Sequence, residues 1–168
     1  MLNSEDFAAV RTQLGRDPRN VIEVAHRCSC GQPDVLKTSP RLDDGTPFPT
    51  LYYMTCPKAT GAIGTLEANG VMKELADALS ADPELAADYE TAHQIYLQER
   101  EAIEHVEEIA GISAGGMPTR VKCLHVLIGH ALAAGPGVNP LGDIALAMLK
   151  DWGQTGPCGG DDIASGSN

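Results

Sequence analysis

The segment "NVIEVAHRCSCGQPDVLKTSPRLDDGTPFPTLYYMTCP", residues 20–57, decides the fold class of this protein. Three short runs in it, at 20–31, 33–40 and 50–56, contain the β-branched and aromatic residues that favour strands. A DDG sequence and two prolines separate the second run from the third, and these residues are strong turn signals. The segment therefore predicts a small three-stranded antiparallel sheet.

Beyond this segment the apolar residues recur with helical spacing. The pattern predicts two helices over 57–81 with a break near Gly70, and further helices over 83 to about 110, 118 to about 134, and 140 to about 152. Asp82 and Pro83 are typical of a helix cap and a first helical position. We therefore predict an α+β domain over residues 20–152, in which the sheet packs on a mainly helical body.

The two ends of the chain differ from this domain. Residues 1–19 are predicted to form a helix capped by Ser4 and a linker, because the periodic pattern stops near Gly15. Residues 153–168 are small, polar and glycine-rich, which predicts a disordered tail in which Cys158 has no role.

The charge of the chain narrows the classes of partner. The 168 residues carry a formal net charge of -11 and include only 12 lysines and arginines. We therefore expect no nucleic-acid partner and no anionic membrane surface, since both usually require clustered basic residues. No apolar run is long enough for a membrane span, and the first residues lack the features of a signal peptide. These features predict a cytoplasmic protein, in which five cysteines indicate metal or thiol chemistry more than disulfides.

Four cysteines are the first candidates for a site. Cys28 and Cys30 end the first predicted strand, and Cys56 ends the third, which runs in the same direction in a meander. Cys123 lies in the first turns of a later predicted helix, where the helix dipole favours a thiolate. Convergence of these thiols would suit zinc, which prefers four soft ligands in a structural site. An iron–sulfur cluster is the alternative cofactor, because Cys56 precedes a proline as in cluster motifs.

The fourth ligand stays open between Cys30 and a histidine, with His26, His125 and His130 as candidates. On a helix, His125 would be turned about 200° from Cys123. Both side chains can therefore point inward only if the helix begins after Cys123. The competing interpretation is that the cysteines merely pack in the core, where unpaired cysteine is common.

A second hypothesis is an enzyme that acts on a small anionic or phosphate-bearing substrate. His125 or His130 would be the general acid or base, and Asp43 or Asp143 would orient the histidine. The anion would be held by Arg27, Arg41 and Arg120.

A third hypothesis is a non-catalytic protein that binds another protein. The stretch "QEREAIEHVEEIA", residues 98–110, is strongly acidic and would dock a basic partner. The competing interpretation is an ordinary solvated helix face.

Three stretches carry a resemblance to a known family. "HRCSCGQPDVLKTSPRLDDGTPFPTLYYMTCP", "GTLEANGVM" and "GMPTRVKCLHVLIGHALAAGPGVNPLGD" resemble bacterial proteins of domain-of-unknown-function family 501, and the version here is similar to the actinobacterial members. The resemblance covers residues 20–152 and implies no reaction. Genes of this family often lie near a septum-formation initiator gene and an exopolyphosphatase-type gene, which suggests a link to cell division or phosphate metabolism.

Overall fold

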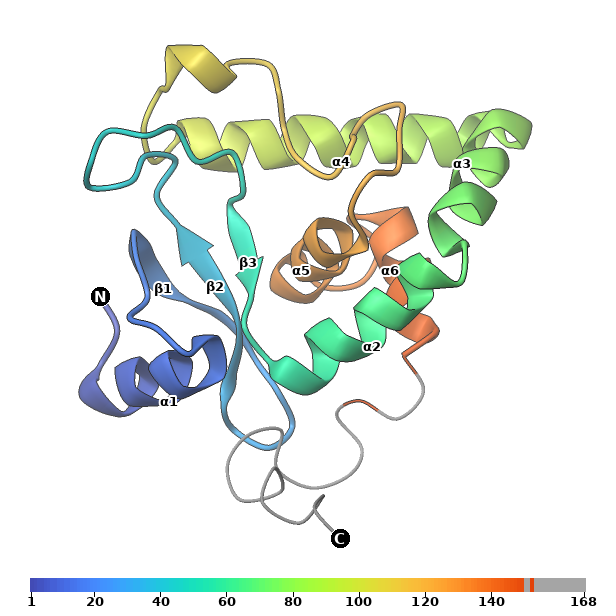
Figure 1. Ribbon diagram of the computed structural model, residues 1–168. Coiled ribbons are helices and arrows are strands. Elements are labelled where there is room, and N and C mark those ends of the chain that lie inside the picture. The colour runs from blue at the N-terminus through green and yellow to red at the C-terminus, as the bar shows by residue number, and fades with distance from the viewer. Residues whose placement is uncertain (150–151, 153–168) are drawn as a thin grey trace, which may run out of the picture.

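The sheet near the N-terminus has three antiparallel strands in the order β1-β2-β3. The computed structural model describes residues 1–149 and 152, so the predicted disordered tail and Cys158 lie outside the described residues. The strands are β1 (Val21–Arg27), β2 (Pro33–Thr38) and β3 (Tyr52–Met54). The predicted meander and the α+β fold class are confirmed (Figure 1).

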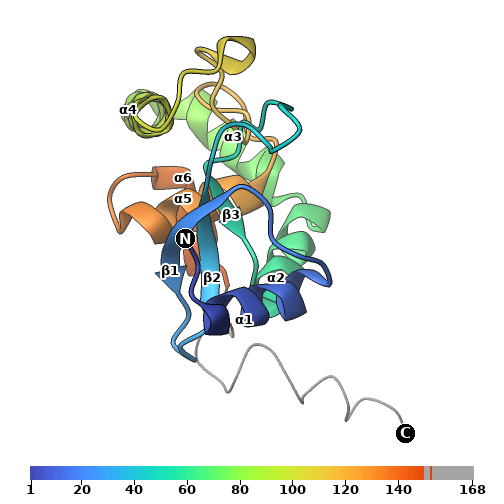
Figure 2. The ribbon, with the colours of Figure 1, turned by 90° about the vertical axis from the view of Figure 1, so that its left-hand side faces the viewer.

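The two faces of the sheet have different surroundings. Val35 pairs with Met54 and Leu36 pairs with Tyr53 in the β2–β3 ladder. Because successive side chains of a strand point to opposite faces, Val35 and Met54 share one face while Leu36 and Tyr53 share the other. Helix α1 lies in front of the sheet in Figure 2, and Figure 1 shows α5 on the opposite side. The sheet therefore separates a face toward α5 from a face toward α1.

The N-cap of helix α1 (Ser4–Leu14) lies one residue before the cap that the sequence predicted. The Asn3 side chain accepts a hydrogen bond from the backbone N–H of Asp6 at 2.8 Å, so Asn3 and not Ser4 is the cap. Asparagine and serine side chains can both accept this bond. Which of the two residues is the cap depends only on where the backbone changes from extended to helical.

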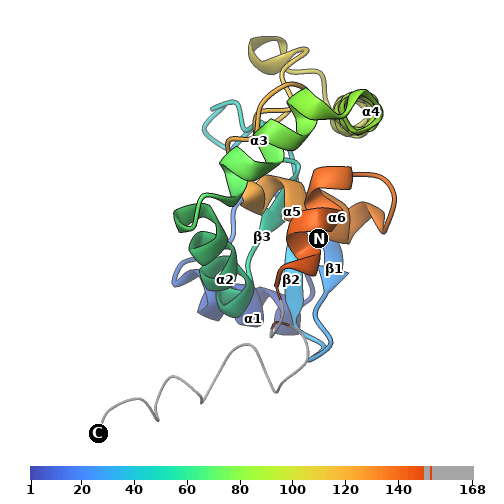
Figure 3. The ribbon, with the colours of Figure 1, turned by 90° about the vertical axis from the view of Figure 1, so that its right-hand side faces the viewer.

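The helical body follows the sheet and lies in front of it in the view of Figure 3. Its helices are α2 (Pro57–Ala68), α3 (Val71–Ala81), α4 (Pro83–Glu101), η1 (Glu107–Ile109), α5 (Leu124–Ala134) and α6 (Pro140–Ala147). The predicted break near Gly70 is confirmed, as is the Asp82 cap, whose side chain accepts from two backbone N–H groups. Within the described part of the chain, none of these helices combines the length and apolar character that crossing a membrane requires.

Helix α4 ends at Glu101, about nine residues before the predicted end near Ala110. The reason is Arg100, whose guanidinium donates to the carbonyls of Ile109 and Ile112. These bonds require the chain to turn back toward α4 after Glu101. The local helical pattern cannot report such a reversal.

Helix α5 begins at Leu124 and not near Pro118, as the sequence predicted. The preceding residues form a turn in which Arg120 N–H donates to Gly116 O and Lys122 N–H donates to Gly115 O. The Tyr89 hydroxyl also donates to Arg120 O at 2.8 Å and ties this turn to α4. The turn leaves Cys123 as the extended cap residue of α5.

Helix α6 ends at Ala147, short of the predicted end near Trp152. The N–H groups of Met148 and Leu149 donate to the carbonyls three residues earlier, at Ala145 and Leu146. This tighter pattern is typical of the last turn of a helix.

Helices α5 and α6 approach each other closely at Gly142, and this contact supports a stability prediction. A Cβ atom at Gly142 would lie 2.2 Å from Leu127 O and 2.9 Å from the Ala131 Cβ. We expect Gly142→Ala to lower the free energy of unfolding in urea by about 2 kcal/mol, because the two helix backbones must separate. Gly61→Ala is the control, since Gly61 on α2 has open space around it and alanine is the better helix former. Equal effects of the two substitutions would contradict the prediction.

Candidate functional site

One group of side chains that could hold a metal ion comes together where α2 ends and α5 begins. The ligand atoms of Glu67, Cys123 and His125 all lie within 4.8 Å of one another. In the part of the chain that the structure describes, no other group of three or more histidine, cysteine or acidic side chains is this compact. The structure thus joins two predicted candidates with a residue that sequence reasoning missed.

The start of α5 makes this grouping possible. Cys123 is the cap residue, with an extended backbone at φ −152° and ψ 111°, and His125 is the second helical residue. Cys123 therefore does not follow the helical spacing that would separate the two side chains by about 200°. The condition that the sequence imposed, a helix that begins after Cys123, is met.

Glu67 joins the two helices through hydrogen bonds to one carboxylate oxygen. Its Oε1 accepts from the backbone N–H of Leu124 at 2.9 Å and lies 3.1 Å from His125 Nδ1. His125 Nε2 lies 3.2 Å from the carbonyl oxygen of Thr60. Both ring nitrogens thus face oxygen acceptors, and this arrangement favours the doubly protonated imidazolium.

The electrostatics agree with this arrangement. The pKa of His125 is raised to about 9, first by its hydrogen bond with Cys123 and also by Glu67, against the effect of burial. Burial alone would raise the pKa of the Cys123 thiol, but the hydrogen bonds from His125 and from the Val126 backbone N–H outweigh it and lower the pKa. Cys123 and His125 therefore form a polarised pair at the N-terminus of a helix.

A pocket of about 310 Å³ adjoins this pair. It lies between β3, α2 and α5, so its walls come from elements far apart in the sequence. Its lining includes both site residues of α5 and is otherwise made largely of apolar and aromatic groups (Thr50, Tyr52, Tyr53, Met54, Thr60, Cys123, His125 and Val126). The pocket gives a small molecule access to the Cys123 thiol and the His125 ring.

The other three predicted cysteines do not belong to this group. Cys28 and Cys56 are buried at 5% and 0% exposure, and Cys30 is half-buried. Cys56 accepts a hydrogen bond from Trp152 Nε1 at 3.3 Å. Among the described residues, no compact group of three ligands includes Cys28, Cys30 or Cys56.

Two of the three predicted anion-binding arginines are ion-paired within the chain. Arg27 donates to both carboxylate oxygens of Asp6, at 2.8 and 2.7 Å. Arg41 pairs with Glu108 at 3.0 Å, and Glu104 lies 3.7 Å away. Arg120 is exposed. The carboxylates thus already neutralise the charges of Arg27 and Arg41.

Two other catalytic candidates, Asp143 and His130, make contacts that stabilise the fold. Asp143 accepts a hydrogen bond from the Gly137 backbone N–H at 2.9 Å and so closes the loop before α6. His130 is fully buried, with its ring stacked on Tyr52 and edge-on to Tyr96. Its Nδ1 faces the Asn139 amide nitrogen at 3.1 Å. Neither residue lines the pocket beside Cys123.

His130 supports a prediction for the pH dependence of stability. Burial lowers its pKa to about 4, whereas histidine in an unfolded chain titrates near 6.5. The unfolded chain therefore binds a proton between these values and the folded chain does not. We expect the free energy of unfolding to fall as pH decreases from about 6.5 to 4, by up to about 3 kcal/mol in total. Urea unfolding at stepped pH measures the slope, and His130→Phe should flatten it; an unchanged slope would contradict the prediction.

One feature of the sequence could have drawn attention to Glu67. It lies within "GTLEANGVM", a stretch that contributes to the family resemblance, but no spacing connected it with Cys123. Thr60 contacts His125 through its backbone carbonyl oxygen, and a pattern of side chains cannot predict such a contact.

Comparison with known proteins identifies a family but no reaction. The sequence profile of the family described as "Protein of unknown function (DUF501)" matches residues 24–147. No curated protein and no solved structure matches the chain significantly.

Proposed function

The chain belongs to the DUF501 family of proteins of unknown function, and from the geometry of its site we propose that it binds one zinc ion through Glu67, Cys123 and His125. The observation that supports this proposal is the convergence of a carboxylate, a thiol and an imidazole within 4.8 Å. These three groups are the usual zinc ligands of proteins. The predicted metal-binding function is thereby kept, with a ligand set of mixed type in place of four cysteines.

The hydrogen bonds of His125 fit the role of a ligand. Zinc would replace the proton on Nδ1, which faces Glu67, while the Nε2–H would keep its bond to Thr60 O. A backbone carbonyl that accepts the second ring N–H is the common outer partner of a zinc-bound histidine. With Cys123 and Glu67 ionised, the ligands would also balance the two positive charges of the ion.

The donor set favours zinc over an iron–sulfur cluster. Clusters are held mainly by cysteine thiolates, usually four of them. Only one of the four described cysteines lies in this group. The iron–sulfur alternative therefore has less support than zinc.

Three protein ligands would leave one of the four usual zinc positions open to water or a substrate, and the pocket that Cys123 and His125 line adjoins these ligands. A zinc ion in such a site activates water or polarises a carbonyl or phosphoryl group of a substrate. The walls formed by Tyr52, Met54 and Val126 would hold the apolar part of a small substrate beside this position. We therefore favour a catalytic over a purely structural role for the ion.

The metal content of the protein tests this proposal directly. The protein is purified without a histidine tag under anaerobic conditions, and zinc, iron and sulfide are measured per chain. We expect about one zinc per chain and little iron or sulfide. Failure to bind zinc even after dialysis against zinc salts would overturn the proposal.

A metal-free thiol enzyme is the second candidate. The specific observation in its favour is that both ring nitrogens of His125 face oxygen acceptors, so the imidazolium can stand beside the Cys123 sulfur without any metal. An ionised cysteine beside a histidine that is oriented by a third group is the general form of a nucleophilic site.

Alkylation of the zinc-free protein tests this second candidate. At pH 7 we expect iodoacetamide to modify Cys123 at least about tenfold faster than Cys30, which is also half-buried. His125→Gln should remove most of this difference, because the imidazolium no longer stabilises the thiolate. Peptide mass spectrometry reads out each site, and equal rates at the two cysteines would exclude an activated thiol.

A further inference from the structure

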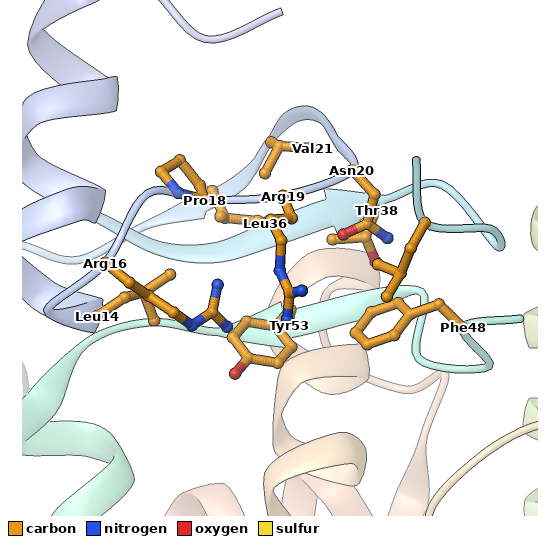
Figure 4. A pocket seen from close by; sticks show the side chains of 11 residues that line it. Leu14, Arg16, Pro18, Arg19, Asn20, Val21, Leu36, Thr38, Phe48 and Tyr53 are labelled. Carbon is orange, nitrogen blue, oxygen red and sulfur yellow. The ribbon is translucent and has the colours of Figure 1, made fainter. Parts of the chain in front are cut away.

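A second pocket lies on the other face of the sheet, toward α1 (Figure 4). It has a volume of about 260 Å³ and is lined by the end of α1, the linker to β1, strands β1 to β3 and the loop before β3. Its residues are Leu14, Arg16, Pro18, Arg19, Asn20, Val21, Leu36, Thr38, Leu42, Phe48 and Tyr53. It shares only Tyr53 with the pocket beside Cys123.

The floor of this pocket is apolar and aromatic. Leu36 and Tyr53 are paired neighbours on this face of the sheet, and Leu36 is only 1% exposed. The rings of Phe48 and Tyr53 are tilted by 41° with centroids 6.2 Å apart. Such a surface suits a flat ring, because aromatic groups associate through tilted and offset contacts.

Two arginines stand over this floor. Arg16 and Arg19 extend from the linker, and their guanidinium groups point toward Tyr53 in Figure 4. Among the described residues neither forms an ion pair with a carboxylate, and Arg16 donates only to the backbone carbonyl of Asp17, at 3.2 Å. By contrast, Arg11, Arg27 and Arg41 are each paired with an acidic side chain.

Asp44 is the acidic side chain on which the charge of Arg19 acts, so it could compete with an anionic ligand for Arg19. The pKa of Asp44 is lowered first by hydrogen bonds from Thr46, and Arg19 adds a smaller effect through its charge. The Asp44 carboxylate thus already has its partner in Thr46, at 2.9 Å from the backbone N–H. In a chain with a net charge of -11, two arginines without a carboxylate partner in one pocket form a local site for an anion.

The linker that carries both arginines is anchored at each end. Asn20 has a positive φ of 50°, and it exchanges two hydrogen bonds of 2.7 Å with Ser39 at the end of β2. At the other end, Gly15 closes α1 in the left-handed conformation, and Arg11 pairs with Asp17 at 3.0 Å. The backbone of the arginines is therefore held in place before any ligand arrives, which lowers the entropic cost of binding.

We propose that this pocket binds a small aromatic molecule that carries one phosphate or carboxylate group. The ring would lie on Phe48 and Tyr53, and the anionic group would accept hydrogen bonds from Arg16 and Arg19. Arginine suits this role, since its planar donors match the oxygens of both anions. The pocket volume of about 260 Å³ lies just below the usual range for ligand sites, so it fits one ring better than a dinucleotide. This site is separate from the proposed zinc site.

Titration with phenyl phosphate, followed by amide NMR shifts at low salt, tests the proposal. We expect phenyl phosphate to bind at least about tenfold more tightly than inorganic phosphate or phenol, because each of these probes has only half of the required chemistry. The shifts should map to residues 14–21 and to Phe48 and Tyr53. The double variant Arg16→Gln/Arg19→Gln should bind at least about tenfold more weakly.

Arg120→Gln is the control, because Arg120 is an exposed arginine that lies outside both the pocket lining and the linker. It should leave the affinity for phenyl phosphate within about twofold of the unchanged chain. Equal weakening by Arg120→Gln and by the double variant would overturn the proposal, as would equal affinity for inorganic phosphate. Absence of shifts at the pocket up to about 10 mM phenyl phosphate would overturn it as well. Cys123→Ala should keep this binding, so failure of the zinc proposal and failure of this one remain distinguishable.

Discussion

Replacement of Cys123 by alanine is expected to reduce bound zinc from about one ion per chain to less than about 0.1. The thiolate is the softest of the three proposed ligands, and two protein ligands alone rarely hold zinc at micromolar concentration. His125→Ala should have a similar effect, and Glu67→Gln a smaller one. Zinc is measured by atomic emission after dialysis against metal-free buffer.

Cys56→Ala provides the sharpest comparison with this variant. The sequence-based hypothesis of four converging cysteines predicts that Cys56→Ala also releases the metal. The geometry predicts that it keeps the zinc, because Cys56 lies outside the group of Glu67, Cys123 and His125. It should nevertheless lower stability somewhat, since Cys56 is fully buried. Loss of zinc from Cys56→Ala with retention by Cys123→Ala would contradict the proposed ligand set.

Zinc binding should also appear as a gain in stability. A ligand that binds only the folded chain stabilises it by about 4 kcal/mol when its concentration is a thousand times the dissociation constant. Addition of zinc should therefore raise the melting temperature of the unchanged chain and of Cys56→Ala, but not that of Cys123→Ala. A rise of equal size in all three would place the metal elsewhere.

Replacement of Arg100 by leucine is expected to lower the free energy of unfolding by about 4 kcal/mol. Arg100 is 1% exposed, and its guanidinium donates to four backbone carbonyls of two loops that pack on α4 (Pro49, Ile109, Ile112 and Ser113). Leucine fills part of the space but leaves these buried and part-buried oxygens without donors, which costs more than the lost bonds alone. Urea unfolding followed by circular dichroism measures the loss.

Two further variants separate the effect of the planar guanidinium donors from the effect of the positive charge. Arg100→Lys keeps the charge but cannot reach four carbonyls in one plane, so we expect a loss of about 2 kcal/mol. Arg11→Leu serves as the surface control, because the Arg11–Asp17 pair is well exposed on both sides. Its effect should stay within about 0.5 kcal/mol. A loss below about 1 kcal/mol for Arg100→Leu would contradict the role assigned to this residue.

The elements that the sequence predicted correctly are those defined by neighbouring residues. The three strands, the break at Gly70 and the Asp82–Pro83 start of α4 all depend on local backbone preference. The errors at the end of α4 and the start of α5 have long-range causes. Arg100 draws the following loop back onto α4, and Tyr89 holds the turn before Cys123. Neither contact has a periodic pattern in the sequence.

The candidate site was likewise predicted only in part from the sequence. The sequence identified Cys123 and His125 by their chemical type, and it also stated the condition under which they could meet. It could not rank Cys123 above Cys28, Cys30 and Cys56, because all four are equally plausible ligands by type. The predicted cofactor, the small anionic ligand and the protein partner linked to cell division each stay a prediction that the experiments above or a co-purification can test.

The sequence by itself determined the fold class, the Asp82 cap of α4 and the kinds of side chain available for chemistry, because these follow from backbone preference and residue type. Only the tertiary structure decided which side chains meet. Glu67 is 58 residues away from His125, and they meet because α2 ends where α5 begins. Arg16 and Arg19 likewise gain a common pocket only when the linker is fixed to β2 through Asn20. Packing between distant segments decides such contacts, and a single sequence contains no local signal for them.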